Sequence, residues 1–139
     1  MSRWIGIAGA CFGLMLVALV APASAQKQKQ AWEYLKEPAF KSAYMKAIGP
    51  RANTPWIARR NGPAPEDTFV TVAGQRYVLS AFCKDHDCGD NNAVILYSPE
   101  KKVVYGTIYE RGKTTLIGDP PGAVATELSA LWKKQWRQG

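Results

Sequence analysis

Apolar residues in the first part of the chain recur at helical spacing directly after a proline. Pro38 suits the first turn of a helix, where its missing N–H would have no intrahelical partner in any case. The apolar residues that follow would lie on one face of an α-helix; they are Phe40, Tyr44, Ala47 and Ile48. Gly49-Pro50 then interrupts the pattern. The sequence therefore predicts a helix that covers another layer with this face.

From residue 68 onward the hydrophobic period changes to two, which is typical of strands. Five runs rich in β-branched and aromatic residues follow one another; they are 68–73, 75–83, 93–97, 103–109 and 113–117. In the second run Tyr77, Leu79 and Ala81 share a face, opposite Arg76, Val78 and Ser80. Gly74, Ser98-Pro99-Glu100-Lys101 and Arg111-Gly112 supply turns between runs. Because short turns join antiparallel neighbours, we expect five antiparallel strands in a meander.

Helical spacing returns at the carboxyl end of the chain. The apolar stripe consists of Val124, Leu128, Leu131 and Trp132, and cations gather near the end of this segment, where the helix dipole favours them. Residues 51–66 carry three prolines and no sustained period, so we expect a long irregular connection anchored by Trp56. The predicted fold class is α+β, a five-stranded antiparallel sheet with flanking α-helices.

The first twenty-five residues have the pattern of a signal peptide. Arg3 precedes an apolar run over residues 5–20, and Ala23-Ser24-Ala25 is a small-residue cleavage site. The run is shorter than the roughly twenty residues that a spanning helix needs, so we expect cleavage and no stable membrane insertion afterwards. Cys11 would leave with this segment. We predict a periplasmic protein whose single domain covers residues 26–139.

Charge and composition narrow the classes of function. The formal net charge is +7, and it becomes +6 once Arg3 is removed. The basic residues are spread along the chain and form no long block, and no nucleic-acid-binding motif is present, so we expect no nucleic-acid partner. Neither apolar stripe calls for a cofactor. The pattern leaves both a monomer and a homodimer open.

The most distinctive segment joins the second and third predicted strands and runs from Phe82 to Asn92. It contains the chain's one histidine, His86, between two cysteines. With Cys11 removed, Cys83 and Cys88 are an even pair, and in an oxidising compartment such a pair forms a disulfide. The bond would close a small ring and make the four residues inside it protrude as a rigid knob, which reduces the entropy lost on binding a partner.

Four other interpretations of this segment compete with the knob. Cys83, His86 and Cys88 could bind a metal, but their spacing matches no common zinc motif. A thiol redox enzyme is also conceivable, yet the cysteines are five positions apart in a context without a βαβ unit. A histidine beside two aspartates could serve a hydrolase, although active sites are normally concave. Finally, the loop could be a solvated hairpin tip held by a disulfide.

The loop also resembles a known family. Cys83-Lys84-Asp85-His86-Asp87-Cys88 is very similar to the Cys-Lys-Pro-His-Asp-Cys loop of the Ivy family, inhibitors of vertebrate lysozyme in Gram-negative bacteria. The following Gly89-Asp90-Asn91 resembles the family as well, and the order of elements is compatible with it over most of residues 26–139. Asp85 differs from the family motif, which has proline at this position.

This resemblance implies a protein inhibitor rather than an enzyme. In the family the loop enters the substrate cleft of c-type lysozyme, so His86 is expected to contact the two catalytic carboxyl groups. Lys84, Asp85 and Asp87 are further candidate contacts, with Cys83 and Cys88 as the brace. The resemblance implies no metal and no cofactor. Because c-type lysozymes are strongly basic and this chain is basic too, lytic transglycosylases of the cell itself are an alternative target.

Overall fold

The computed structural model describes residues 27–138, and the predicted signal peptide lies outside this range. Five antiparallel strands form one sheet in the order β1-β2-β3-β4-β5. Their bounds are Thr68–Val72, Gln75–Cys83, Asn91–Ser98, Val103–Glu110 and Lys113–Ile117. The predicted α+β class and the meander are confirmed. No helix in the described range is long and apolar enough to cross a membrane.

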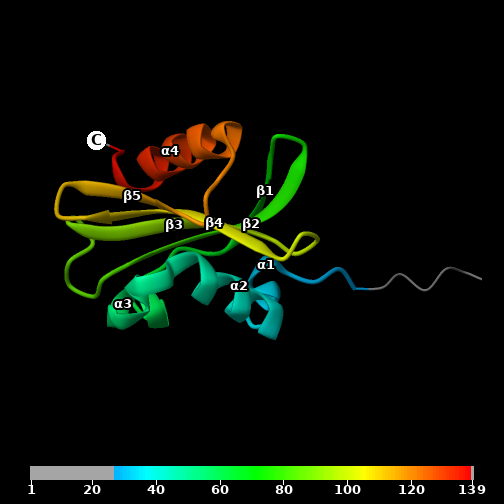
Figure 1. The fold of residues 1–139 in the computed structure, drawn as a ribbon, viewed down its shortest axis with the longest axis horizontal. Coiled ribbons are helices and arrows are strands. Elements are labelled where there is room, and N and C mark those ends of the chain that lie inside the picture. The colour runs from blue at the N-terminus through cyan, green and yellow to red at the C-terminus, as the bar shows by residue number, and fades with distance from the viewer. Residues whose placement is uncertain (1–26, 139) are drawn as a thin grey trace, which may run out of the picture.

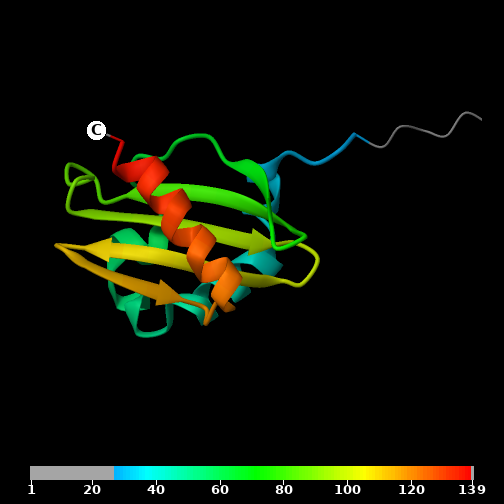
Figure 2. The ribbon, with the colours of Figure 1, turned by 90° about the horizontal axis from the view of Figure 1, so that it is seen from above.

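Helices cover both faces of the sheet (Figure 1). On one face lie α1 (Ala31–Tyr34), α2 (Pro38–Ile48), the 3-10 helix η1 (Gly49–Asn53) and α3 (Pro55–Arg59). On the other face α4 (Gly122–Trp136) runs across the strands, as Figure 2 shows from above. The helices predicted after Pro38 and around Leu128 are therefore confirmed, with Pro38 in the first turn of α2.

The sheet is apolar on both sides because its alternating side chains feed two separate cores. Val78 and Phe82 of β2 pack with Phe40, Tyr44 and Ile48 of α2. Tyr77 and Ala81, on the opposite face of the same strand, pack with Val124 and Leu128 of α4. β3, the central strand, is buried along its whole length, since it contributes side chains to both cores.

The prediction of an irregular connection over residues 51–66 was wrong in its first half. η1 and α3 lie there, and each begins with a proline near its start, at Pro50 and Pro55. Elements of five residues are too short to show a helical period, which explains why the pattern did not reveal them. Trp56 is buried at 9% exposure and does anchor this segment.

The turns of the sheet follow the residues that suit them. The β1–β2 turn consists of Ala73 and Gly74, and the β4–β5 turn of Arg111 and Gly112, all four with positive φ. Two successive residues with positive φ form a type I′ turn, which matches the twist of a two-residue hairpin. This geometry brings the β2–β3 and β4–β5 connections to the same end of the sheet (Figure 1).

Candidate functional site

The loop between β2 and β3 is closed at its base by a disulfide. Cys83 is the last residue of β2 and fully buried, and its sulfur is bonded to that of Cys88, with the two Cα atoms 4.9 Å apart. The predicted pairing is thus confirmed. The ring encloses four residues, and their order places His86 at the side farthest from the strands.

A single β-turn forms the tip of the loop. The Asp87 N–H donates to the Lys84 carbonyl over 3.0 Å, so the turn runs from Lys84 to Asp87. Only its third residue, His86, has positive φ, at 59°, which is the type II pattern. Histidine adopts this left-handed conformation more readily than most residues. The turn therefore directs the His86 side chain away from the sheet, and 93% of it is exposed.

Charged neighbours surround His86 without enclosing it. The Asp85 carboxylate lies 3.4 Å from His86 Nε2, and 69% of the Asp85 side chain is exposed. Asp87 instead faces inward along the loop, where it accepts a hydrogen bond of 2.7 Å from the Asn91 side-chain amide and lies 3.7 Å from Lys84 Nζ. Asp87 therefore braces the loop, whereas Asp85 and His86 are presented to solvent.

Helix α4, which packs on the face of the sheet opposite to α1 to α3, supports the loop through a buried asparagine. Asn92, which is fully buried, donates to the Cys88 carbonyl over 2.7 Å and accepts from Trp132 Nε1 over 2.7 Å. Arg137 adds a bond of 3.3 Å to the Gly89 carbonyl while its guanidinium lies over the Trp132 ring. The end of α4 thus fixes the position of the disulfide.

The segment after α3 supports the base of the loop from the face of the sheet that α1 to α3 cover. The Cys83 N–H donates to the Pro63 carbonyl over 3.1 Å. Gly62 lies so close that a Cβ atom there would be 1.8 Å from the Cys83 carbonyl oxygen. The chain can approach the loop this closely only because residue 62 has no side chain.

Sequence reasoning found the segment up to Asn92 but not the contacts that support the loop. The supporting residues are Gly62, Pro63, Asn91, Asn92, Trp132 and Arg137. The pair Asn91-Asn92 carried one signal, since two amides directly before an apolar strand need partners if that strand is buried. The partner of Asn92 is forty residues away, and no local pattern indicates it.

The geometry of the loop argues against the metal-binding, thiol-redox and hydrolase interpretations. Both sulfur atoms are in the disulfide, so neither is a thiolate that could bind metal or attack a substrate. Within residues 27–138 no group of three His, Cys, Asp or Glu side chains gathers as metal ligands would. Two hollows of the described surface lie beside α2, and His86 lines neither of them.

The fold and the loop together define a class of protein: a small α+β scaffold that presents one braced, polar loop. Comparison with known proteins gives the family. The family model described as "Inhibitor of vertebrate lysozyme (Ivy)" matches residues 39–138, which is most of the chain. The chain belongs to the Ivy family.

Two curated relatives are similar to this chain. An "Inhibitor of vertebrate lysozyme" from Pseudomonas aeruginosa is 33% identical over 87 residues, which cover 62% of this chain and 57% of the relative. An uncharacterised protein from Yersinia pestis is 31% identical over 75 residues, covering 53% and 49%. The chain therefore spans about half the length of the curated relatives it matches.

Proposed function

We propose that this protein inhibits c-type lysozyme in the periplasm, by placing the Cys83–Cys88 loop in the substrate cleft of the enzyme. His86 contacts the two catalytic carboxyl groups. The observation that carries the proposal is the tip of the loop, where a braced turn presents an imidazole that is 93% exposed. Family membership and the similar inhibitor from Pseudomonas aeruginosa support the same target.

The chemistry of the target suits an imidazole. Lysozyme uses one protonated carboxyl group as general acid and one ionised carboxylate, held apart in pKa by their surroundings. In retaining enzymes of this kind the two groups are only about 5 to 5.5 Å apart. An imidazole has two ring nitrogens on different edges, so one residue can hydrogen-bond to both groups. A protonated imidazole would in addition pair with the ionised carboxylate.

The bracing of the loop contributes to affinity through entropy. Each rotamer-rich side chain that becomes fixed on binding costs about 0.5 to 1.5 kcal/mol, and a mobile loop adds to this. Here the disulfide, the turn hydrogen bond and Asp87 fix the backbone around His86 before any partner arrives. The partner therefore orders little beyond the exposed side chains.

The remaining residues of the loop take different roles. Lys84 reaches carboxylates or carbonyls at the rim of the cleft, and Asp87 holds the loop together. Asp85 would be repelled by the catalytic carboxylates of the enzyme, and its proximity to His86 Nε2, at 3.4 Å, offsets that repulsion when the imidazole is protonated. The protein acts by occlusion and performs no reaction itself.

The test is inhibition of hen and human lysozyme by the wild type and by His86→Asn. Asparagine tolerates positive φ, so this variant removes the imidazole while keeping the turn. A central contact of this kind is worth 2 kcal/mol or more, so we expect inhibition to weaken at least about 30-fold with an unchanged melting temperature. The control is Lys101→Ala, which alters an exposed residue in the β3–β4 turn at the opposite end of the sheet.

Two outcomes would contradict the proposal in different ways. If His86→Asn inhibits as well as the wild type, the imidazole is not the central contact. If the wild type leaves both lysozymes active but binds lytic transglycosylases, the loop serves the alternative target.

A further inference from the structure

The net positive charge of the described residues comes from one layer of the fold. Residues 27–60, which form α1, α2, η1 and α3, contain eight basic and two acidic residues, a net charge of +6. Residues 61–138, which form the sheet, the loop and α4, contain nine of each and are neutral overall. The excess of cations thus lies on the face of the sheet that α1 to α3 cover (Figure 1).

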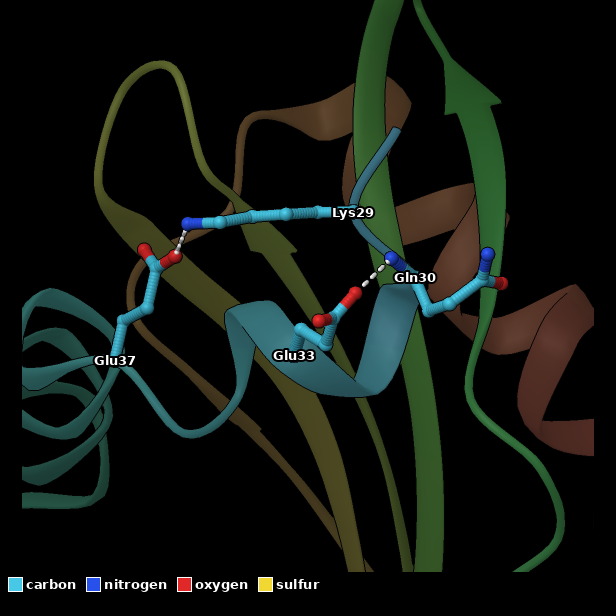
Figure 3. Close-up of polar contacts among 4 residues, drawn as sticks. All are labelled: Lys29, Gln30, Glu33 and Glu37. Carbon is cyan, nitrogen blue, oxygen red and sulfur yellow. Dashed lines mark hydrogen bonds and ion pairs between the residues drawn. The ribbon is translucent and has the colours of Figure 1, made fainter. Parts of the chain in front are cut away.

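The two carboxylates of this layer are already occupied at its amino-terminal end. Glu33 accepts the Gln30 N–H over 2.5 Å, and Glu37 forms an ion pair with Lys29, as Figure 3 shows. Neither therefore neutralises the cations farther along the layer. Among the residues that the structure describes, Lys36, Lys41 and Lys46 have no carboxylate within ion-pair distance.

Apolar side chains are exposed among these lysines. Trp32 is 45% exposed and Met45 40%, and they are two of the three large apolar side chains exposed in residues 27–138. Lys36 Nζ lies 4.2 Å from the centre of the Trp32 ring. On α2, Met45 follows Lys41 by one helical turn and precedes Lys46 directly, and all three are exposed.

Four of the exposed side chains of this layer gather around one hollow, and Lys46 lines a second hollow beside η1. Lys36, Lys41, Met45 and Arg59 line one hollow of about 230 Å³ between α2, α3 and the segment that joins α1 to α2, and Glu37, the partner of Lys29, lines it as well. We define the basic-aromatic face as Trp32, Lys36, Lys41, Met45, Lys46 and Arg59. It combines four cations with exposed apolar groups, whereas the other described residues together carry a net charge of +2.

We infer that the basic-aromatic face docks on the surface of an anionic phospholipid bilayer. Lysine and arginine near such a surface are attracted by the anionic headgroups, and tryptophan is favoured at the level of the headgroups. The ammonium group of Lys36 lies over the Trp32 ring, so the face already presents a cation and an aromatic ring together. Binding of this kind is peripheral and reversible, and it leaves the loop at the end of the sheet free.

A nucleic acid is also a polyanion, but it fits this face less well. Lysine and arginine are attracted by the phosphates of nucleic acids and of lipids alike, so the four cations of the face alone do not separate the two partners. An exposed methionine flanked by lysines gains nothing from a phosphate backbone, whereas it gains burial at a lipid surface.

The test is co-sedimentation of the protein with vesicles of equal parts phosphatidylglycerol and phosphatidylcholine, and with vesicles of phosphatidylcholine alone. The patch variant combines Lys36→Gln, Lys41→Gln and Lys46→Gln. The matched control combines Lys101→Gln, Lys133→Gln and Lys134→Gln, which removes the same charge from exposed positions outside the basic-aromatic face. A third variant, Trp32→Ala, removes the aromatic ring without changing the charge.

We expect the wild type to bind the anionic vesicles only, and to bind them more weakly at high salt. The patch variant should bind about tenfold or more weaker than the wild type, and the control variant nearly as tightly as the wild type. Trp32→Ala should bind more weakly than the wild type. The inference is overturned if anionic vesicles are not bound, if both triple variants lose binding equally, if Trp32→Ala binds unchanged, or if duplex DNA is bound more tightly at the same salt. Inhibition of lysozyme by the patch variant should be unaltered, so this result is independent of the proposed function.

Discussion

Gly62 offers the sharpest test of how the loop is held in place. A Cβ atom at this position would lie 1.8 Å from the Cys83 carbonyl oxygen, whereas Cβ atoms essentially never come closer than 3.0 Å to such an atom. It would also lie 3.3 Å from the Asp85 nitrogen. Gly62 does not have positive φ, so the substitution Gly62→Ala acts by steric overlap alone.

The size of the effect follows from what must move. The Cys83 carbonyl belongs to the backbone at the end of β2, so the overlap cannot be relieved by rotating a side chain. Either β2 or the segment after α3 must shift, and that shift stretches the hydrogen bond of 3.1 Å between the Cys83 N–H and the Pro63 carbonyl. Overpacking and the weakened bond together should lower the free energy of unfolding by about 2 to 4 kcal/mol.

The assay is urea unfolding, with Gly89→Ala as the matched control. Gly89 lies between β2 and β3, in the loop that Gly62 contacts; it has no positive φ, and a Cβ atom there would meet nothing within 4 Å. We expect the control to retain wild-type stability and Gly62→Ala to be less stable and a weaker inhibitor. Equal stability of the two variants would refute the close packing of the loop against the segment after α3.

Three further substitutions test other contacts, each by urea unfolding. Asp85→Pro places proline at the second position of a type II turn, where the fixed φ of proline fits. The free energy of unfolding should therefore rise by about 0.4 to 1 kcal/mol, and a lower value than in the wild type would contradict this turn geometry. Trp132→Phe keeps an aromatic ring but leaves Asn92 Oδ1 without its indole donor, so it should cost about 1 to 3 kcal/mol. The exposed Trp32→Phe should cost less than about 0.5 kcal/mol, and equal costs would contradict the role of this hydrogen bond. Burial raises the pKa of the Tyr44 hydroxyl, which donates to a backbone carbonyl of α3, so this group stabilises the fold fully below about pH 10 and less as the pH rises further. Tyr44→Phe should therefore lose less stability at alkaline pH than the wild type. An equal loss of stability in the two proteins would assign the alkaline effect to other groups.

The sequence predicted the fold well where apolar residues repeat regularly over eight or more positions. α2, α4 and the longer strands are of this kind. It failed at η1 and α3, which are too short for a period, and it began β3 two residues late. Asn91 and Asn92 are polar, yet they pair with Glu110 and Tyr109 in the sheet, so only the neighbouring strand reveals them as part of β3.

Only part of the candidate site could be predicted from the sequence. The two cysteines, the single histidine and the turn are local in sequence, so the loop could be recognised and its disulfide expected. Its supports come from residues far away in the chain, such as Gly62 and Trp132. Because such contacts depend on how helices pack on the sheet, no periodicity or spacing indicates them.

The distribution of charge changes what the net charge implies for the proposed target. From the sequence, a chain that carries +6 once Arg3 is removed forgoes long-range attraction to a strongly basic lysozyme. In the structure the excess belongs to the layer of α1 to α3, while residues 83–90 contain one lysine and three aspartates. At physiological ionic strength interactions beyond about 8 Å are largely screened, so the charges nearest the contact dominate. The loop itself is thus acidic, although Arg111 and Arg137 lie beside it. The excess of cations that would oppose the encounter with a basic enzyme belongs to a different face of the molecule.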